Sequence, residues 1–230
     1  MNAKTYLHEL KDKVLDHPFL RHPFLQQFSS QPLTFGQART FALLYYPHIL
    51  RTRLYQANAL GVTPDERIQA VLADILYDEY GNGDPSRSHM EVYRKLLRAL
   101  DFSEEEMANA PITPEQQGYI DTMMRLTQGT DWLAAVGVAG IAGEWPIPPY
   151  YRMLLTGLRT VPGLSDDALE LFVGHIELDI HHSRIIEEAI MPYLETRAGQ
   201  ASLWRGIELN LNARLVQLNG LQREVFGVGA

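Results

Sequence analysis

The chain has 230 residues, of which 46% are hydrophobic and 21% charged, so it is long enough to bury a substantial core. Its formal net charge is −8, so its surface repels phosphate backbones and anionic lipids, and we expect neither a nucleic acid nor a membrane as a partner. Cysteine is absent, which excludes disulfides, iron–sulfur clusters and a cysteine nucleophile and leaves only nitrogen and oxygen ligands for a metal.

The sequence carries no sign of export or of membrane insertion. Its first residues include acids and lack the apolar segment of a signal peptide. The longest apolar run, Trp132 to Gly143, is too short and too rich in glycine to span a bilayer. We therefore expect a soluble, cytoplasmic protein.

Helical spacing of apolar residues recurs along the whole chain, and no stretch has the alternation of a strand. Segments that contain proline or glycine separate the helical stretches. In chain order, we expect helices at residues 3–16, 34–60, 65–80, 89–100, 114–128, 131–144, 147–159, 166–195 and 199–226. Typical helix starts with capping side chains are Thr63-Pro64-Asp65-Glu66, Ser103-Glu104-Glu105-Glu106 and Thr113-Pro114-Glu115. Without an internal repeat or a long linker, residues 1–230 should form one all-α domain, a helical bundle.

One predicted helix carries an unusual set of side chains on its apolar face. On a helix, His175, Asp179 and His182 fall within about 60° of one another, and Ile186 continues the same stripe. Two imidazoles and a carboxylate are costly on an apolar face without a partner, and they form a familiar ligand set for a first-row metal. His181 points about 100° away, so we do not expect it in the cluster. The alternative is a charged helix that faces solvent.

Two glutamates also extend apolar stripes. Glu79 continues the stripe Ile68, Val71, Leu72, Ile75 and Leu76. A turn rich in glycine follows it and allows His89 to fold back towards Glu79; otherwise both residues face water at helix ends. Glu144 is the only acid on the apolar part of its helix, whose glycines permit close packing, and no basic residue lies near it in the sequence. A buried glutamate of this kind is more often functional than structural.

These acids and imidazoles predict a two-metal centre. The expected ligands are Glu79, His89, Glu144, His175, Asp179 and His182. Two divalent ions bring four positive charges, and the three carboxylates offset three of them. The remaining charge favours an anionic ligand or a reduced oxygen species, which suits a catalytic centre with open positions better than a single structural ion. We expect no catalytic residue beyond the ligands.

The order of these residues resembles that of the haem-oxygenase-like di-iron oxidase family, which includes an undecene-forming fatty-acid decarboxylase and the chlamydial p-aminobenzoate synthase. The resemblance covers nearly the whole chain, including Tyr45-Tyr46-Pro47-His48 and Ile147-Pro148. Ferritin-like di-iron proteins fit poorly, because they use two Glu-x-x-His motifs that this chain lacks. The resemblance implies a seven-helix bundle that holds two Fe ions, with Asp84 or Glu91 as alternatives to His89. Leu25 and Leu154 appear at the positions of the tyrosine and lysine that the p-aminobenzoate-forming member is thought to consume, so we expect no self-sacrificing chemistry.

The function that the resemblance implies is that of a non-haem di-iron oxidoreductase whose Fe²⁺ reacts with dioxygen, with or without an external reductant. Its substrate would be a small carboxylate-bearing molecule of the amino-acid or fatty-acid type, changed by oxidative C–C cleavage, desaturation or N-oxygenation. Candidate substrate-binding residues are Tyr45, Tyr46, His48, Arg152 and Arg214.

Other functions stay open at this point. A metal-free enzyme of the quinone-synthase or thiaminase type and a non-enzymatic interaction protein are the alternatives. A haem oxygenase would need a proximal histidine such as His17 or His22, and it would leave the six-residue set unexplained. A homodimer is compatible with the fold and size, but no motif indicates it.

Overall fold

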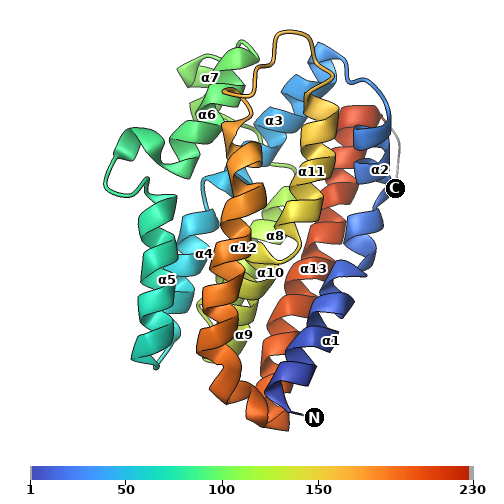
Figure 1. Ribbon diagram of the computed structural model, residues 1–230. Coiled ribbons are helices and arrows are strands. Elements are labelled where there is room, and N and C mark those ends of the chain that lie inside the picture. Colours follow the sequence, from blue (N-terminus) through green and yellow to red (C-terminus); the bar gives the residue numbers. More distant parts are fainter. Residues whose placement is uncertain (1, 228–230) are drawn as a thin grey trace.

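Helices form the framework of the computed structural model, which describes residues 2–227 and contains no strand in that range (Figure 1). The α-helices are α1 (Ala3–Leu15), α2 (Pro23–Ser30), α3 (Phe35–Ile49), α4 (Thr52–Val62), α5 (Glu66–Glu79), α6 (His89–Ala99), α7 (Glu104–Ala108), α8 (Pro114–Thr127), α9 (Trp132–Val136), α10 (Ala142–Glu144), α11 (Ile147–Leu158), α12 (Glu170–Ile190) and α13 (Arg197–Phe226). The predicted all-α bundle is thus confirmed. None of the helices described is both long and apolar enough to cross a membrane.

The segment before α3 is more ordered than its sequence indicates. Residues Pro18–Arg21 form a 3-10 turn and α2 follows, although no helix was expected there. The Nδ1 atoms of His17 and His22 accept hydrogen bonds from the backbone N–H groups of Phe19 and Phe24, and each histidine precedes a proline in the first turn. Both histidines therefore act as helix caps.

The expected single helix at residues 34–60 is wrong, because it divides into α3 and α4. Pro47 lies inside the last turn of α3, where it has no backbone N–H to donate. The side chain of Arg51 donates to the carbonyl of Pro47 at 2.9 Å, and that of Thr52 donates to the carbonyl of His48 at 3.3 Å. The first bond satisfies the carbonyl group of Pro47, whereas the carbonyl group of His48 also accepts from the backbone N–H of Arg51.

The turn between α5 and α6 reverses the chain. Gly81, Asn82 and Gly83 all have positive φ angles, of 84°, 54° and 87°. A Cβ on Gly81 would lie 2.2 Å from the carbonyl oxygen of Asp84, so this position requires glycine. The reversal brings the first residue of α6 back beside the last turn of α5.

The centre of the bundle is the segment from α9 to α10, which packs between α12 and α13. Residues Gly137–Ile141 between them form a π-helical turn rather than the continuous α-helix expected over 131–144. A Cβ on Gly137 would lie 2.6 Å from the carbonyl oxygen of Leu203 in α13, and one on Gly140 would lie 2.9 Å from the Ile186 side chain in α12. The small residues thus permit the close packing that their pattern predicts.

The long C-terminal helices complete the framework. In Figure 1, α12 (orange) runs between α5 and the red α13, and α12 also packs on α11. Helix α13 contacts α8, α9 and the π-helical turn along its length. The apolar faces of these elements form one core, and the acids and imidazoles of interest lie at its α5–α10–α12 side.

Candidate metal centre

Helices α5, α6, α10 and α12 bring together the acids and imidazoles that the sequence singles out, in two groups of three. The first group is Glu79, His89 and His175, and the second is Glu144, Asp179 and His182. Within each group the potential ligand atoms all lie within 4.8 Å of one another. Every one of these residues except His182 lines a single cavity.

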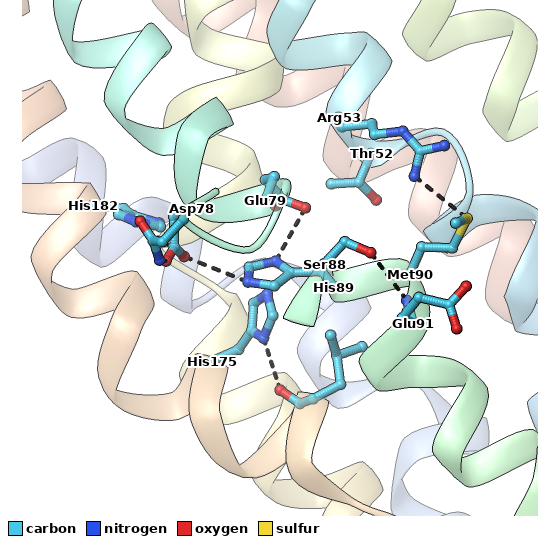
Figure 2. A network of polar contacts seen from close by, with 12 residues as sticks. Thr52, Arg53, Asp78, Glu79, Ser88, His89, Met90, Glu91, His175 and His182 are labelled. Carbon is cyan, nitrogen blue, oxygen red and sulfur yellow. Dashed lines mark hydrogen bonds and ion pairs between the residues drawn. The ribbon is translucent and has the colours of Figure 1, made fainter. Parts of the chain in front are cut away.

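In the first group, His89 faces Glu79 across the α5–α6 turn (Figure 2). Its Nδ1 atom lies 3.0 Å from Oε2 of Glu79, but off the direction of a hydrogen bond, so this buried nitrogen has no hydrogen-bond partner. The ring of His175 packs edge-on against that of His89, with centroids 4.4 Å apart. Nδ1 of His175 lies 2.7 Å from the carbonyl oxygen of Leu171, so a proton on Nδ1 leaves Nε2 free to bind a metal.

In the second group, Nδ1 of His182 lies 3.5 Å from Oε2 of Glu144. Both residues are buried, as is Asp179. Burial is the main cause that raises the pKa of Glu144, and burial together with the charges of Glu144 and Glu79 raises the pKa of Asp179 well above its ordinary value. Two carboxyl groups in so dry a place need a cation if both are to be ionised.

The imidazoles of the first group differ in charge. Burial alone would lower the pKa of His89, but the charges of Glu79 and Asp78 outweigh it and raise the pKa to about 10. Burial, reinforced by the neighbouring His89, lowers the pKa of His175 to about 4. The neighbouring carboxylates therefore favour the protonated form of His89, whereas burial favours the neutral form of His175, which is the form that binds a metal.

Asp78 is a further member of the centre that the sequence reasoning missed. Its Oδ2 atom lies 3.4 Å from Nε2 of His89 and 3.9 Å from Nε2 of His182, and it has no hydrogen-bond partner (Figure 2). The contact with His89 is the main cause that lowers the pKa of Asp78 to about 2. The only sequence signal was its position beside Glu79, because Asp78 lies off the apolar stripe of α5.

Three other residues considered from the sequence do not belong to either group. His181 is exposed, as its position on the helix predicts. Asp84 is exposed and accepts hydrogen bonds from Ser86, and Glu91 forms an ion pair with Arg94. Neither of the two acids takes the place of His89.

The predicted substrate-binding residues divide into two sets. His48 and Arg214 line the cavity, and the buried Tyr45 packs against the His48 ring with centroids 5.2 Å apart. Tyr46 points elsewhere, since it stacks on Tyr93 and accepts a hydrogen bond from Arg94. Arg152 is exposed on the outer face of α11. Cavity residues that the sequence did not indicate include Tyr55, Gln56, Tyr119, Tyr151 and Asn210.

The donor set fits iron. It offers imidazole nitrogens and carboxylate oxygens in two groups, with unpartnered buried atoms on Asp78 and His89, and this is the ligand chemistry of non-haem iron sites. A haem would need an N-terminal histidine as its ligand, but Nδ1 of His17 and of His22 caps a helix, and their rings also form hydrogen bonds with Asn212 and Asn219.

The chain is similar in sequence to curated proteins of known name. The chain is 30% identical to a 4-aminobenzoate synthase from Chlamydia pneumoniae over 177 residues, which cover 76% of this chain and 77% of that protein. It is 26% identical to a 4-chloro-allylglycine synthase from Streptantibioticus cattleyicolor over 228 residues, which cover 98% of this chain and 86% of that protein.

Solved structures share the fold. A CADD-like protein of unknown function from Nostoc punctiforme superposes with a TM-score of 0.80 at 16% identity, over 97% of this chain and 98% of its own. A domain of unknown function with a heme oxygenase-like fold from Shewanella denitrificans gives a TM-score of 0.72 at 16% identity, over 99% and 94%.

The family match covers the residues of the centre. The sequence profile described as "iron-containing redox enzyme" matches residues 39–215 of this chain, a range that includes all six predicted ligands and Asp78. The chain therefore belongs to the family of iron-containing redox enzymes, and it is an oxidoreductase with the haem-oxygenase-like fold.

Proposed function

We propose that the two groups each hold one iron ion and that the chain is a dioxygen-activating di-iron oxidase or oxygenase. The observation that carries this proposal is that two three-residue groups of possible ligands share helix α12, and that five of the six residues line a single cavity. Ferrous ions bound there would supply the electrons that activate dioxygen towards a substrate.

The side chains of the protein would hold the ions and keep water out. Glu79, His89 and His175 would bind one ion, and Glu144, Asp179 and His182 the other. The bond between His175 and the carbonyl oxygen of Leu171 fixes that ring, so that Nε2 faces the cavity. The burial of the second group gives it a dry environment, in which electrostatic interactions are strong.

The charge of the centre is more nearly balanced than the ligands alone imply. Asp78 adds a fourth carboxylate beside the three that would bind metal. Two ferrous ions bring four positive charges, so the metal-bound centre with Asp78 would be close to neutral. An anionic substrate would then need a positive partner elsewhere in the cavity.

We propose a small, external, carboxylate-bearing molecule of the amino-acid type as the substrate. The names of the two relatives, 4-aminobenzoate synthase and 4-chloro-allylglycine synthase, denote products that carry a carboxylate and an amino group. Leu25 and Leu154 are fully buried aliphatic side chains, and they offer neither a phenol nor an amine to be consumed. The proposal includes oxidative C–C cleavage, desaturation and N-oxygenation as reactions that such a centre performs.

Anaerobic loading with ferrous iron tests the proposal. The wild-type chain should bind about two irons, and Glu144→Ala should lose one of them, because it removes a ligand of the second group only. Glu177→Gln is the matched control, since it neutralises an exposed acid of α12. Exposure of the loaded wild type to oxygen should produce a transient visible absorption band. The absence of bound iron after reconstitution, or of any band in fully loaded protein, would contradict the proposal.

A further inference from the structure

The cavity beside the metal centre has a second polar end. His48 from α3, Tyr55 and Gln56 from α4, and Arg214 from α13 line the same cavity as the metal-binding groups. Its volume is about 50 Å³, which is space for a few water molecules, because one water occupies roughly 10–15 Å³ on this measure. A compact ligand fits such a space better than a long acyl chain does.

Arg214 is a buried cation without a counter-charge. Its side chain is only 4% exposed, and its Nε donates to Oδ1 of Asn210 at 3.1 Å. The guanidinium faces the rings of Tyr119 and Tyr150, with centroids at 5.6 and 5.8 Å. Nη1 has no hydrogen-bond partner, and no carboxylate in residues 2–227 forms an ion pair with this side chain. Burial of a guanidinium in this way is strongly unfavourable unless a bound ligand supplies a negative charge and hydrogen-bond acceptors.

Other polar atoms at this end of the cavity also lack partners. They are Nδ1 of His48, the hydroxyl group of Tyr55 and Oε1 of Gln56, all buried. Together with Nη1 of Arg214 they provide hydrogen-bond donors for an anion and one acceptor for an amine or a hydroxyl group. Side chains from three helices thus converge on a space that has the form of a ligand site.

The chemistry of this end selects a carboxylate. The planar fork of an arginine matches the two oxygens of a carboxylate, and a single cation balances its single charge. The near-neutral metal centre offers no surplus charge for the same group. An amino group on the ligand would find its acceptor in Gln56.

We propose that Arg214 is the anchor of the substrate carboxylate, and that the substrate is a compact carboxylate of amino-acid size. Its carboxylate would lie on the guanidinium, and its other end would point towards the groups around His175 and Asp179. The direction of the reacting end rests on the proposed function, whereas the binding of the carboxylate does not.

Binding of simple probes tests the anchor without turnover. The full-length chain is titrated anaerobically with butyrate, with its neutral analogue butyramide and with dodecanoate, both loaded with ferrous iron and after chelation, and binding is followed by NMR. Wild type should bind butyrate at least about tenfold more tightly than butyramide in both states, because only the carboxylate carries a negative charge that pairs with the guanidinium. Arg214→Met should abolish this preference. Arg159→Gln, which removes an exposed guanidinium from the end of α11, should keep it.

Thermal unfolding separates an anchor from a structural residue. Because the charge of Arg214 is unpaired, Arg214→Met should leave the melting temperature of the ligand-free protein unchanged or raise it. If this variant does not fold, Arg214→Lys decides: weaker butyrate binding with unchanged butyramide binding supports the anchor, and wild-type affinity for both overturns it.

Three results would overturn the proposal. They are a preference for butyrate that survives Arg214→Met, butyrate binding that requires iron, and tighter binding of dodecanoate than of butyrate. Iron content is measured on the same samples. If the wild-type protein binds no iron but still binds butyrate more tightly than butyramide, the proposed function is contradicted and the role of Arg214 as the carboxylate anchor is still supported.

Discussion

Substitution of Asp78 by asparagine tests whether one carboxylate orients an imidazole in each metal-binding group. Nδ1 of His89 and Nδ1 of His182 face the carboxylates of Glu79 and Glu144, at 3.0 and 3.5 Å. The opposite nitrogen of each ring, Nε2, faces Oδ2 of Asp78, at 3.4 and 3.9 Å. When Nδ1 binds a metal, Nε2 carries the proton, and Asp78 is placed to hold both rings in that tautomer.

The expected magnitude follows from the role of such outer partners. Loss of a carboxylate behind a metal-binding histidine weakens metal binding by roughly 10- to 100-fold, or about 1.4 to 2.8 kcal/mol. Because Asp78 contacts one histidine of each group, Asp78→Asn should weaken the binding of both ions rather than of one. Anaerobic titration with ferrous iron against a competing chelator measures the two dissociation constants. Asp74→Asn, an exposed change on the same helix, is the control. Wild-type affinity for either ion in Asp78→Asn would refute the reasoning.

Three further predictions concern stability. Addition of ferrous iron at about 100 times its dissociation constant should stabilise the fold by about 2.7 kcal/mol for each ion, which a rise in melting temperature reversed by a chelator would reveal. Gly157→Ala should destabilise the protein by about 1–3 kcal/mol in denaturant titrations, because the new Cβ would meet the carbonyl oxygen of Phe28 at 2.2 Å, whereas Gly118→Ala, with nothing within 4 Å, should be neutral or stabilising. The ion pair with Arg223 is the main cause that lowers the pKa of Glu115 to about 2. This pair stabilises the folded state by about 1 kcal/mol or less. The stabilisation is present when the pH is above 4.5, the ordinary pKa of a glutamate, and is lost as the pH falls towards 2. Glu115→Gln should therefore have a lower melting temperature than wild type at pH 7 and the same melting temperature in strong acid.

Much of the fold follows from local patterns in the sequence. The capping box at Ser103 and the cap at Thr113 are present as predicted, since these signals depend only on neighbouring residues. At the start of α5 the cap is Asp65, whereas the Thr63 side chain donates to the carbonyl oxygen of Ala59. The π-helical turn at Gly137–Ile141 could not be predicted in this way, because Gly137 and Gly140 pack closely against α13 and α12, which are distant in the sequence. The break at Leu50 has a local cause in Pro47, which the expected helix over 34–60 did not take into account.

The centre was predictable as far as helical periodicity reaches. Periodicity places a residue on a face, so it identified Glu79 and Glu144 as the ends of apolar stripes. Asp78 escaped because the α5–α6 turn and α12, which give it two imidazoles as neighbours, are not visible in the pattern of α5 alone. Arginines posed the same difficulty. Arg152 and Arg214 are equally plausible anion-binding residues in the sequence, and only tertiary packing leaves Arg152 exposed and buries Arg214 at the cavity.

The charges of the half-buried Asp78 and of the buried Arg214 have complementary roles when the charge of the whole centre and its cavity is counted. With only three carboxylates, two ferrous ions would leave the centre with one positive charge. That charge would attract the substrate carboxylate to the metals, where the carboxylate would occupy positions needed for dioxygen. The fourth carboxylate, Asp78, removes that surplus, and the unpaired guanidinium of Arg214 offers the positive charge at the other end of the same cavity. A carboxylate substrate is thereby directed away from the open metal positions. In the double variant Asp78→Asn and Arg214→Met, butyrate should bind at the metal centre instead of at residue 214, so that its binding becomes dependent on iron.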